Sequence, residues 1–200
     1  MPPPARPPRA DAVRNRALLL AAAEVEFAER GGEASIADIA RRAGVAKGTV
    51  FRHFPTKEDL VTAVVGGHFA ALDAAARHRL GAPDPGAALW EFLTVAAGSL
   101  QRQDLEFLQA ISEGDSAVAA IVGELRVSTD ALVDRARASG AVRADVTGTD
   151  VLLLLCAAVH TVGLQPDAAP GLWRRYLAIV IDGLRPEGAT RLPGPVPTRP

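Results

Sequence analysis

Residues 35–60 read SIADIARRAGVAKGTVFRHFPTKEDL, and this stretch decides the fold. The spacing of its first apolar residues predicts a short helix with one buried face, made by Ile36, Ile39, Ala40 and Ala43. Ser35 can cap the start of this helix, and Gly44 can adopt the left-handed conformation that ends it. A second short helix is predicted from Lys47 to Phe54, because Pro55 blocks its continuation. Two short helices joined by a tight glycine turn form a helix-turn-helix.

The residues on either side predict a longer helix before the motif and another after it. The first runs from Ala12 to Arg30, and Gly31-Gly32 provides its stop. Thr56 and Asp59 have the spacing of a capping box, which opens the long helix that follows. The apolar residues Val45, Val50 and Phe54 are expected to pack against Phe27, Ile39 and Ala43. The polar residues Lys47, Thr49, Arg52 and His53 are expected to face outward.

The rest of the chain also has helical periodicity, and β-branched residues never form long alternating runs. Further helices are expected near residues 84–102, 104–113, 116–139, 149–164 and 171–184. We predict an all-α fold with a helix-turn-helix DNA-binding domain at 12–58 and a helical-bundle ligand-binding and dimerisation domain at 59–185. The proline-rich ends, residues 1–11 and 186–200, have little to bury and are expected to be a disordered arm and tail.

Charge is distributed unevenly along the 200 residues. Residues 1–57 hold ten Lys and Arg against six Asp and Glu, a net charge of +4, within a chain whose total is −1. A basic head on an acidic body fits a module that meets a polyanion, although a solvated surface has the same composition.

Compartment and membrane signals favour the cytoplasm. The single cysteine, Cys156, has no intramolecular disulfide partner, and the N-terminus lacks the apolar core of a secretory signal peptide. The longest apolar run, residues 151–159, is shorter than the roughly 20 residues that span a bilayer. We therefore expect a cytoplasmic protein with no membrane partner.

The order of these features resembles the N-terminal domain of the TetR family of transcriptional regulators. The resemblance rests on the first helix ending in FAERGG, the two short helices, the KGT start, the HF ending and the KED of the next helix. It implies a sequence-specific, DNA-binding regulator, most often a repressor, that binds a palindromic operator as a dimer.

The same resemblance implies which residues contact DNA. Lys47, Thr49 and Arg52 would face base edges or nearby phosphates, His53 and Lys57 would hold the backbone, and the Gly48 amide would approach it closely. Arginine can bond guanine bidentately, and free amides at a helix start attract anions. Phe51 belongs to the same surface but replaces the tyrosine common in the family, so it has no hydroxyl for a phosphate. Ala46 stands where serine or threonine often caps the helix, a loss of roughly 1 kcal/mol.

The last two helices predict a homodimer. Residues 151–164 are apolar almost all round, and the next helix carries an apolar stripe of Trp173, Leu177, Val180, Ile181 and Leu184. The alternative is that both helices fill the core of a monomer.

The body is also expected to enclose a pocket for a small-molecule effector, mainly hydrophobic or aromatic. The candidate lining residues lie on separate helices and are Phe69, Trp90, Phe92, Phe107 and His160. Ordinary core packing is the alternative for each of them. Gly66-Gly67 can let the long helix pivot between body and head.

Other functions have weaker support. Cys156 and His160 lie one turn apart, and with His68 and His78 they raise the question of a metal site. A cysteine in an apolar helix is more often a small buried hydrophobic residue, so we expect no metal and no cofactor. No nucleophile elbow or phosphate-binding glycine loop occurs, so we do not expect an enzyme. The alternatives left open are a DNA-binding dimer without an effector and a small-molecule-binding protein or enzyme.

Overall fold

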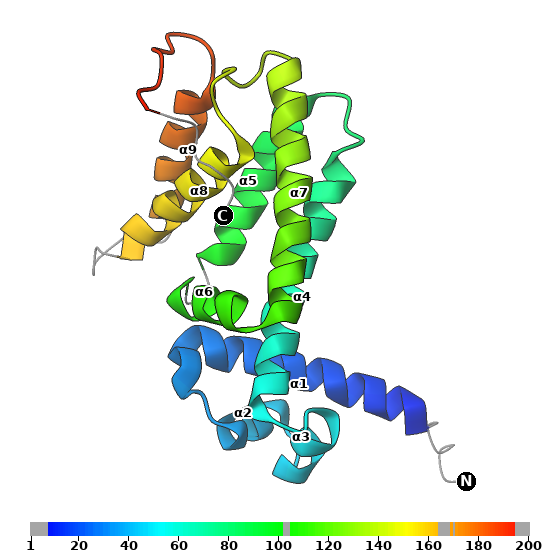
Figure 1. The fold of residues 1–200 in the computed structure, drawn as a ribbon. Helices are drawn as coiled ribbons and strands as arrows, with labels where there is room; N and C mark the ends of the chain where they lie inside the picture. Colours follow the sequence, from blue (N-terminus) through cyan, green and yellow to red (C-terminus); the bar gives the residue numbers. More distant parts are fainter. Residues whose placement is uncertain (1–7, 102–104, 164–168, 170, 195–200) are drawn as a thin grey trace.

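A computed structural model describes residues 8–101, 105–163, 169 and 171–194 (Figure 1). Over these residues the regular structure is entirely helical, which confirms the all-α prediction. The elements are α1 (Pro8–Arg30), the 3-10 turn η1 (Gly31–Glu33), α2 (Ile36–Ala43), α3 (Lys47–His53), α4 (Lys57–Arg79), α5 (Pro85–Leu100), α6 (Leu105–Gly114), α7 (Ser116–Ala138), α8 (Gly148–Gly163) and α9 (Leu172–Leu184).

Helices α2 to α9 lie where the sequence predicts them, and α1 differs at its start. It begins at Pro8, so the disorder expected for residues 8–11 is wrong, while residues 1–7 lie outside the described part of the chain. Proline is well suited to the first position of a helix, because the N–H that it lacks would have no helical partner there.

The molecule has a head, formed by α1 to α3, and a body above it, formed by α4 to α9 (Figure 1). The two short helices lie beneath α1, and α6 lies across the other side of α1. Every helix around the core of the head contributes at least one buried apolar side chain. These side chains are Leu19, Ala23, Phe27, Ile39, Val50, Phe54 and Leu60. The expected packing of α3 against α1 and α2 is therefore present.

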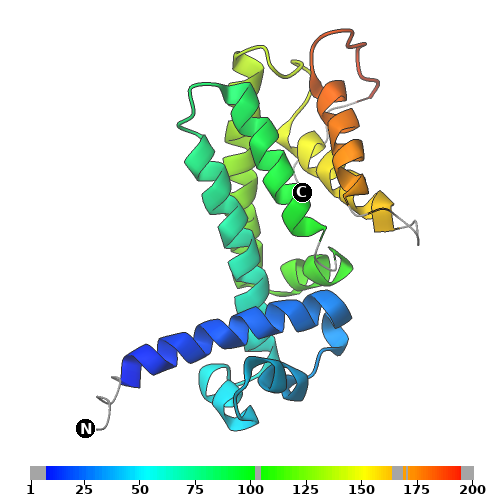
Figure 2. The same cartoon turned by 180° about the vertical axis from the view of Figure 1, so that it is seen from behind.

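Helix α4 connects the two parts. The Thr56 hydroxyl accepts from the Asp59 amide at 3.0 Å and the Asp59 carboxylate accepts from the Thr56 amide at 3.0 Å, which confirms the capping box. From this start α4 runs out of the head and along α5 and α7, as the view from behind shows (Figure 2). By length and composition alone α4 would also suffice to cross a membrane, but half of its most apolar window is buried inside the protein. It is a core helix shared by head and body.

The contact between α4 and α7 is the most extensive between any two helices described. It includes a buried polar cluster, in which the Asp73 carboxylate accepts from the Ser128 hydroxyl at 2.5 Å and from Arg77 Nε at 2.7 Å. At the end nearer the head, the Thr62 hydroxyl donates to Asp115, the residue that caps α7. This hydrogen bond lowers the pKa of the Asp115 carboxyl. Hydrogen bonds at the start of α7 and near its middle thus fix how α4 lies on it.

The segment after α9 departs from the prediction of disorder. Arg143 holds Asp145 through two hydrogen bonds of 2.6 and 2.9 Å and also donates to the Thr190 carbonyl. The Leu192 amide in turn donates to Asp145 at 3.3 Å, and the Arg143 guanidinium lowers the pKa of that carboxyl to about 2. Residues 186–194 are therefore placed against the loop between α7 and α8, whereas 195–200 lie outside the described residues.

The two central glycines of α4 have different surroundings, although the helix continues through both. A Cβ at position 66 would lie 3.2 Å from Ile121 Cδ1 of α7, while a Cβ at position 67 would meet nothing. Gly67→Ala should raise the free energy of unfolding by about 0.5–1 kcal/mol, because alanine loses less backbone entropy in a helix.

Gly66→Ala brings the same helical gain but forces Ile121 to move, so its gain should be smaller or absent. Urea unfolding of both variants measures the difference. Equal stabilisation by the two substitutions would show that α4 and α7 do not approach closely at Gly66.

Candidate DNA-binding surface and effector cavity

The turn between α2 and α3 fixes the position of the second short helix. Ser35 caps α2 through its hydroxyl, which accepts from the Asp38 amide at 3.2 Å. Gly44 has a φ of 69°, a left-handed conformation that favours glycine, and the Val45 amide then bonds the Ala40 carbonyl at 3.0 Å. The chain reverses sharply here, so that α3 presents one side to the head core and the other to solvent.

The outward side of α3 carries the polar residues predicted for DNA contact. Lys47, Gly48 and Arg52 are exposed, whereas Thr49 and His53 are half-buried. Arg52 Nη2 donates to the Thr49 hydroxyl at 2.8 Å, so these two side chains act as one unit. Six of the seven predicted residues therefore lie on α3, and the seventh, Lys57, begins α4.

Two of the predicted residues, Phe51 and Lys57, have contacts that the sequence did not indicate. Phe51 is 43% exposed, with the Lys47 ammonium 5.9 Å from its ring centre. Lys57 begins α4, and its ammonium donates to the Gly32 carbonyl at 2.5 Å, which ties α4 to the end of α1. Lys57 thus has a structural contact in addition to any contact with DNA.

Sequence reasoning missed Arg16, an exposed residue of α1 that contacts the end of α3. Its guanidinium is 4.9 Å from the ring centre of Phe54, the residue that ends α3. A cation stacked on an aromatic ring in this way helps to hold α1 against the end of α3. The helical spacing of α1 marked only its apolar face, so nothing in the sequence singled out this arginine.

Buried charge anchors α2 to α1 behind the recognition surface. Glu26 is almost fully buried, and its carboxylate accepts from Arg42 Nε at 2.7 Å. Arg42 also donates to Glu29 at 2.7 Å, and the hydrogen bond to Glu26 raises the pKa of the Arg42 guanidinium. At the start of α2, the hydrogen bond from Ser35, together with the nearby Arg41 and Arg30, lowers the pKa of the Asp38 carboxyl.

The body contains a cavity of about 380 Å³. Helices α4, α5, α7 and α8 form its wall, and most of the wall is apolar: Phe69, Leu72, Phe92, Ala96, Leu100, Leu125, Leu152 and Leu155. Its volume falls in the range typical of small-molecule sites. Two of the five predicted lining residues, Phe69 and Phe92, are among these.

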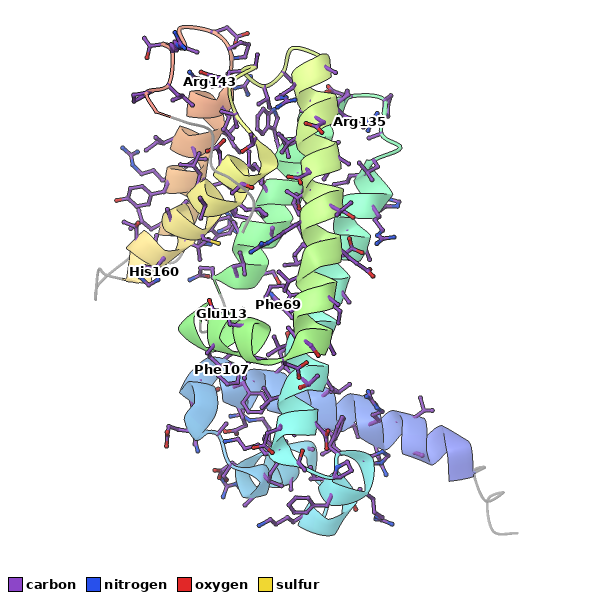
Figure 3. The ribbon with its side chains drawn as sticks, in the orientation of Figure 1. Phe69, Phe107, Glu113, Arg135, Arg143 and His160 are labelled. Carbon is purple, nitrogen blue, oxygen red and sulfur yellow. The ribbon has the colours of Figure 1, made fainter. Side chains whose placement is uncertain are left out.

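The other three predicted lining residues do not line this cavity, which corrects the expectation that all five surround one pocket. Phe107 points from α6 to the head, where its ring stacks on Phe27 with 5.4 Å between centres (Figure 3). The Arg185 guanidinium lies over the ring of Trp90, 5.8 Å from the centre of that ring. His160 is exposed near the end of α8 (Figure 3). The sequence shows that these residues are aromatic, but it does not show which residues of other helices their rings will contact.

Cys156 also differs from expectation, because it is exposed and lines the cavity instead of being buried in the core. No group of three or more His, Cys, Asp or Glu side chains able to hold a metal ion occurs among the described residues.

Two family models match the chain. One, described as bacterial regulatory proteins of the tetR family, matches residues 19–64, and the other, described as the C-terminal domain of SbtR-like transcriptional regulators, matches residues 84–186. Among curated proteins, an HTH-type transcriptional repressor of Mycobacterium tuberculosis is 58% identical over 50 residues. This match covers 24% of the chain and only 27% of that protein.

Three solved structures are similar to this chain over almost the whole length of the solved proteins. A TetR transcriptional regulator of Streptomyces coelicolor is 32% identical with a TM-score of 0.68, and the match covers 86% of this chain and 98% of that one. A TetR regulatory protein of Mycobacterium vanbaalenii is 33% identical with a TM-score of 0.64, covering 90% and 99%. A third structure concerns the control of antibiotic production by bacterial hormones, at 29% identity and a TM-score of 0.62, covering 86% and 98%.

The stability of the head should depend on the ion pair between Glu26 and Arg42. Arg42→Ala leaves this buried carboxylate without its closest cation, whereas Glu29→Ala removes only an exposed partner of the same arginine. Because an uncompensated buried charge is costly, Arg42→Ala should lower the urea midpoint at least about twice as far as Glu29→Ala. Circular dichroism during urea unfolding measures both midpoints, and equal losses would contradict the assigned role of Glu26.

Proposed function

Since the chain belongs to the TetR family of bacterial transcriptional regulators, we propose that it binds a palindromic operator as a homodimer and releases it when a small molecule fills the cavity. The observation that carries this proposal is the solvent-facing side of α3, the second helix of the helix-turn-helix, where Lys47 is exposed and Arg52 donates to Thr49. The proposal places the protein in the cytoplasm, where its operator would be.

The proposed DNA contacts follow from the chemistry of the exposed side of α3. Arg52 has the fork of donors that pairs with guanine, and Thr49 holds that fork at 2.8 Å. Gly48 has open space around its Cα, so a phosphate can approach the backbone at the start of α3. Arg16, His53 and Lys57 border this face, and we assign them to the DNA backbone.

The proposed homodimer rests on the outer faces of α8 and α9. Both helices bury one side in the body, yet Leu153, Leu154 and Ile179 remain 61%, 40% and 57% exposed. Large apolar side chains grouped on adjacent helices are typical of protein interfaces. A two-fold pair of heads would also set the spacing between two operator half-sites.

The proposed effector control rests on the cavity and on the contacts that lead from it to the head. Leu100 lines the cavity at the end of α5, and α6, the next helix along the chain, carries Phe107 onto Phe27 of α1. Phe69 lines it from α4, which itself continues into the head. The relative connected with bacterial hormones supports a diffusible signal as the effector. The alternative is a DNA-binding dimer without an effector.

Arginine and lysine variants separate base recognition from backbone binding. Arg52→Ala should cost roughly tenfold in operator affinity and flatten the preference among operator sequences. Lys57→Ala should weaken all duplexes alike and reduce the salt dependence, since phosphate contacts carry no sequence information.

Fluorescence anisotropy with the operator and scrambled duplexes at several salt concentrations gives both quantities. Arg137→Ala, at the far end of the body, serves as the control, and thermal melts check that Lys57→Ala keeps its fold despite the lost bond to Gly32. Unchanged binding by both head variants would refute the assignment.

The dimer is tested by charge substitution on its proposed face. The protein should sediment as a dimer at micromolar concentration, and Leu154→Asp with Ile179→Asp should give a folded monomer, because each buried carboxylate would lack a partner. Val13→Asp, which changes a side chain that is 71% exposed on the head, should stay dimeric. A wild-type monomer at this concentration would exclude the proposed interface.

A further inference from the structure

The cavity changes in character from its floor to its rim. Phe92, Ala96 and Leu155 at the floor are almost fully buried. At the rim Leu153 and Cys156 are exposed, and the charged side chains of the wall, Arg126 and Asp130, both come from α7. A molecule that fills this space therefore meets an apolar chamber at one end and charge at the other.

The two charged residues at the rim differ in how they are engaged. Asp130 has an interaction of its own, and its Oδ1 lies so close to Gly148 that a Cβ there would be only 1.9 Å away. The carboxylate is thus lodged against the first residue of α8. Arg126 is exposed and makes no hydrogen bond or ion pair with any described residue. On α7 itself, the acid one turn after Arg126 is Asp130, whose carboxylate is held against Gly148, and Glu124 accepts from Arg77 at 3.2 Å.

We propose that the effector of this protein is an amphipathic anion, with its apolar part in the chamber and a carboxylate paired with Arg126. This inference rests on the proposed function, in which the cavity is the effector site. A guanidinium pairs with a carboxylate through two parallel hydrogen bonds, and low-dielectric walls beside the rim strengthen that attraction. A ligand amine would instead be repelled by Arg126, and the one carboxylate of the described cavity wall, Asp130, is already held against Gly148 of α8.

Three small-molecule probes that share a ten-carbon alkyl group and differ in their polar group test the inference. Decanoate, decan-1-ol and decylamine are titrated into the full-length protein by calorimetry, below their critical micelle concentrations. Decanoate should bind at least about tenfold more tightly than decan-1-ol, and decylamine should bind most weakly. The pair 1-naphthoate and 1-naphthol repeats the comparison with an aromatic body.

Variants at position 126 assign the preference to this side chain. Arg126→Gln should bring the decanoate-to-decanol ratio to about one while leaving decanol binding unchanged, and Arg126→Lys should keep part of the ratio. Arg137→Ala removes a cation from α7 outside the cavity and should keep all of it. A ratio near one in the wild type, a preference for decylamine, a preference that survives Arg126→Gln, or no binding of either anion overturns the inference.

Operator affinity with each probe separates this inference from the proposed function. Anion binding through Arg126 that leaves operator affinity unchanged would refute effector control and keep the anion site. Operator release by decanol and decanoate alike, at equal affinity, would keep effector control and refute the anion site.

Discussion

The rest of the structure depends on α4 being buried in two cores at once. Its first turns complete the head, where Leu60 is fully buried, and its later turns lie along α7, where Val65 and Ala76 are equally inaccessible. A helix packed at both ends has little freedom to move at one end alone. The Thr62–Asp115 and Asp73–Ser128 hydrogen bonds add direction to this packing. Head and body are therefore joined without a linker, so that a displacement of α4 in the body carries the head with it.

Most of this fold was predictable because its determinants are local. Ser35 with Asp38, Gly44, and Thr56 with Asp59 each act within one turn of helix, and all of them have the geometry that the sequence indicates. The polar face of α3 was predictable for the same reason, since helical periodicity separates it from Val50 and Phe54.

The parts that escaped prediction depend on contacts between distant residues. Phe107 is aromatic like Phe92, but only the packing of α6 on α1 decides that it meets Phe27 and not the cavity. The segment after α9 looks too polar and proline-rich to fold, yet the paired charges of Arg143 and Asp145, 47 residues away, hold its backbone. Arg16 and Arg126 carry no local signal that separates them from solvated arginines.

The length of α4 has a consequence for how much movement a regulator of this shape needs. Twenty-three residues at the rise of an α-helix make a lever of roughly 34 Å from the body to the head. A rotation of about 5° about its far end moves the head end by about 3 Å, as much as the full length of a hydrogen bond. Under the proposed effector control, a change in the width of the cavity by less than one methyl group would therefore suffice to move the head by a distance that matters for a DNA groove. In the proposed mechanism, leverage of this kind would let α3 keep its own conformation while its orientation toward DNA changes.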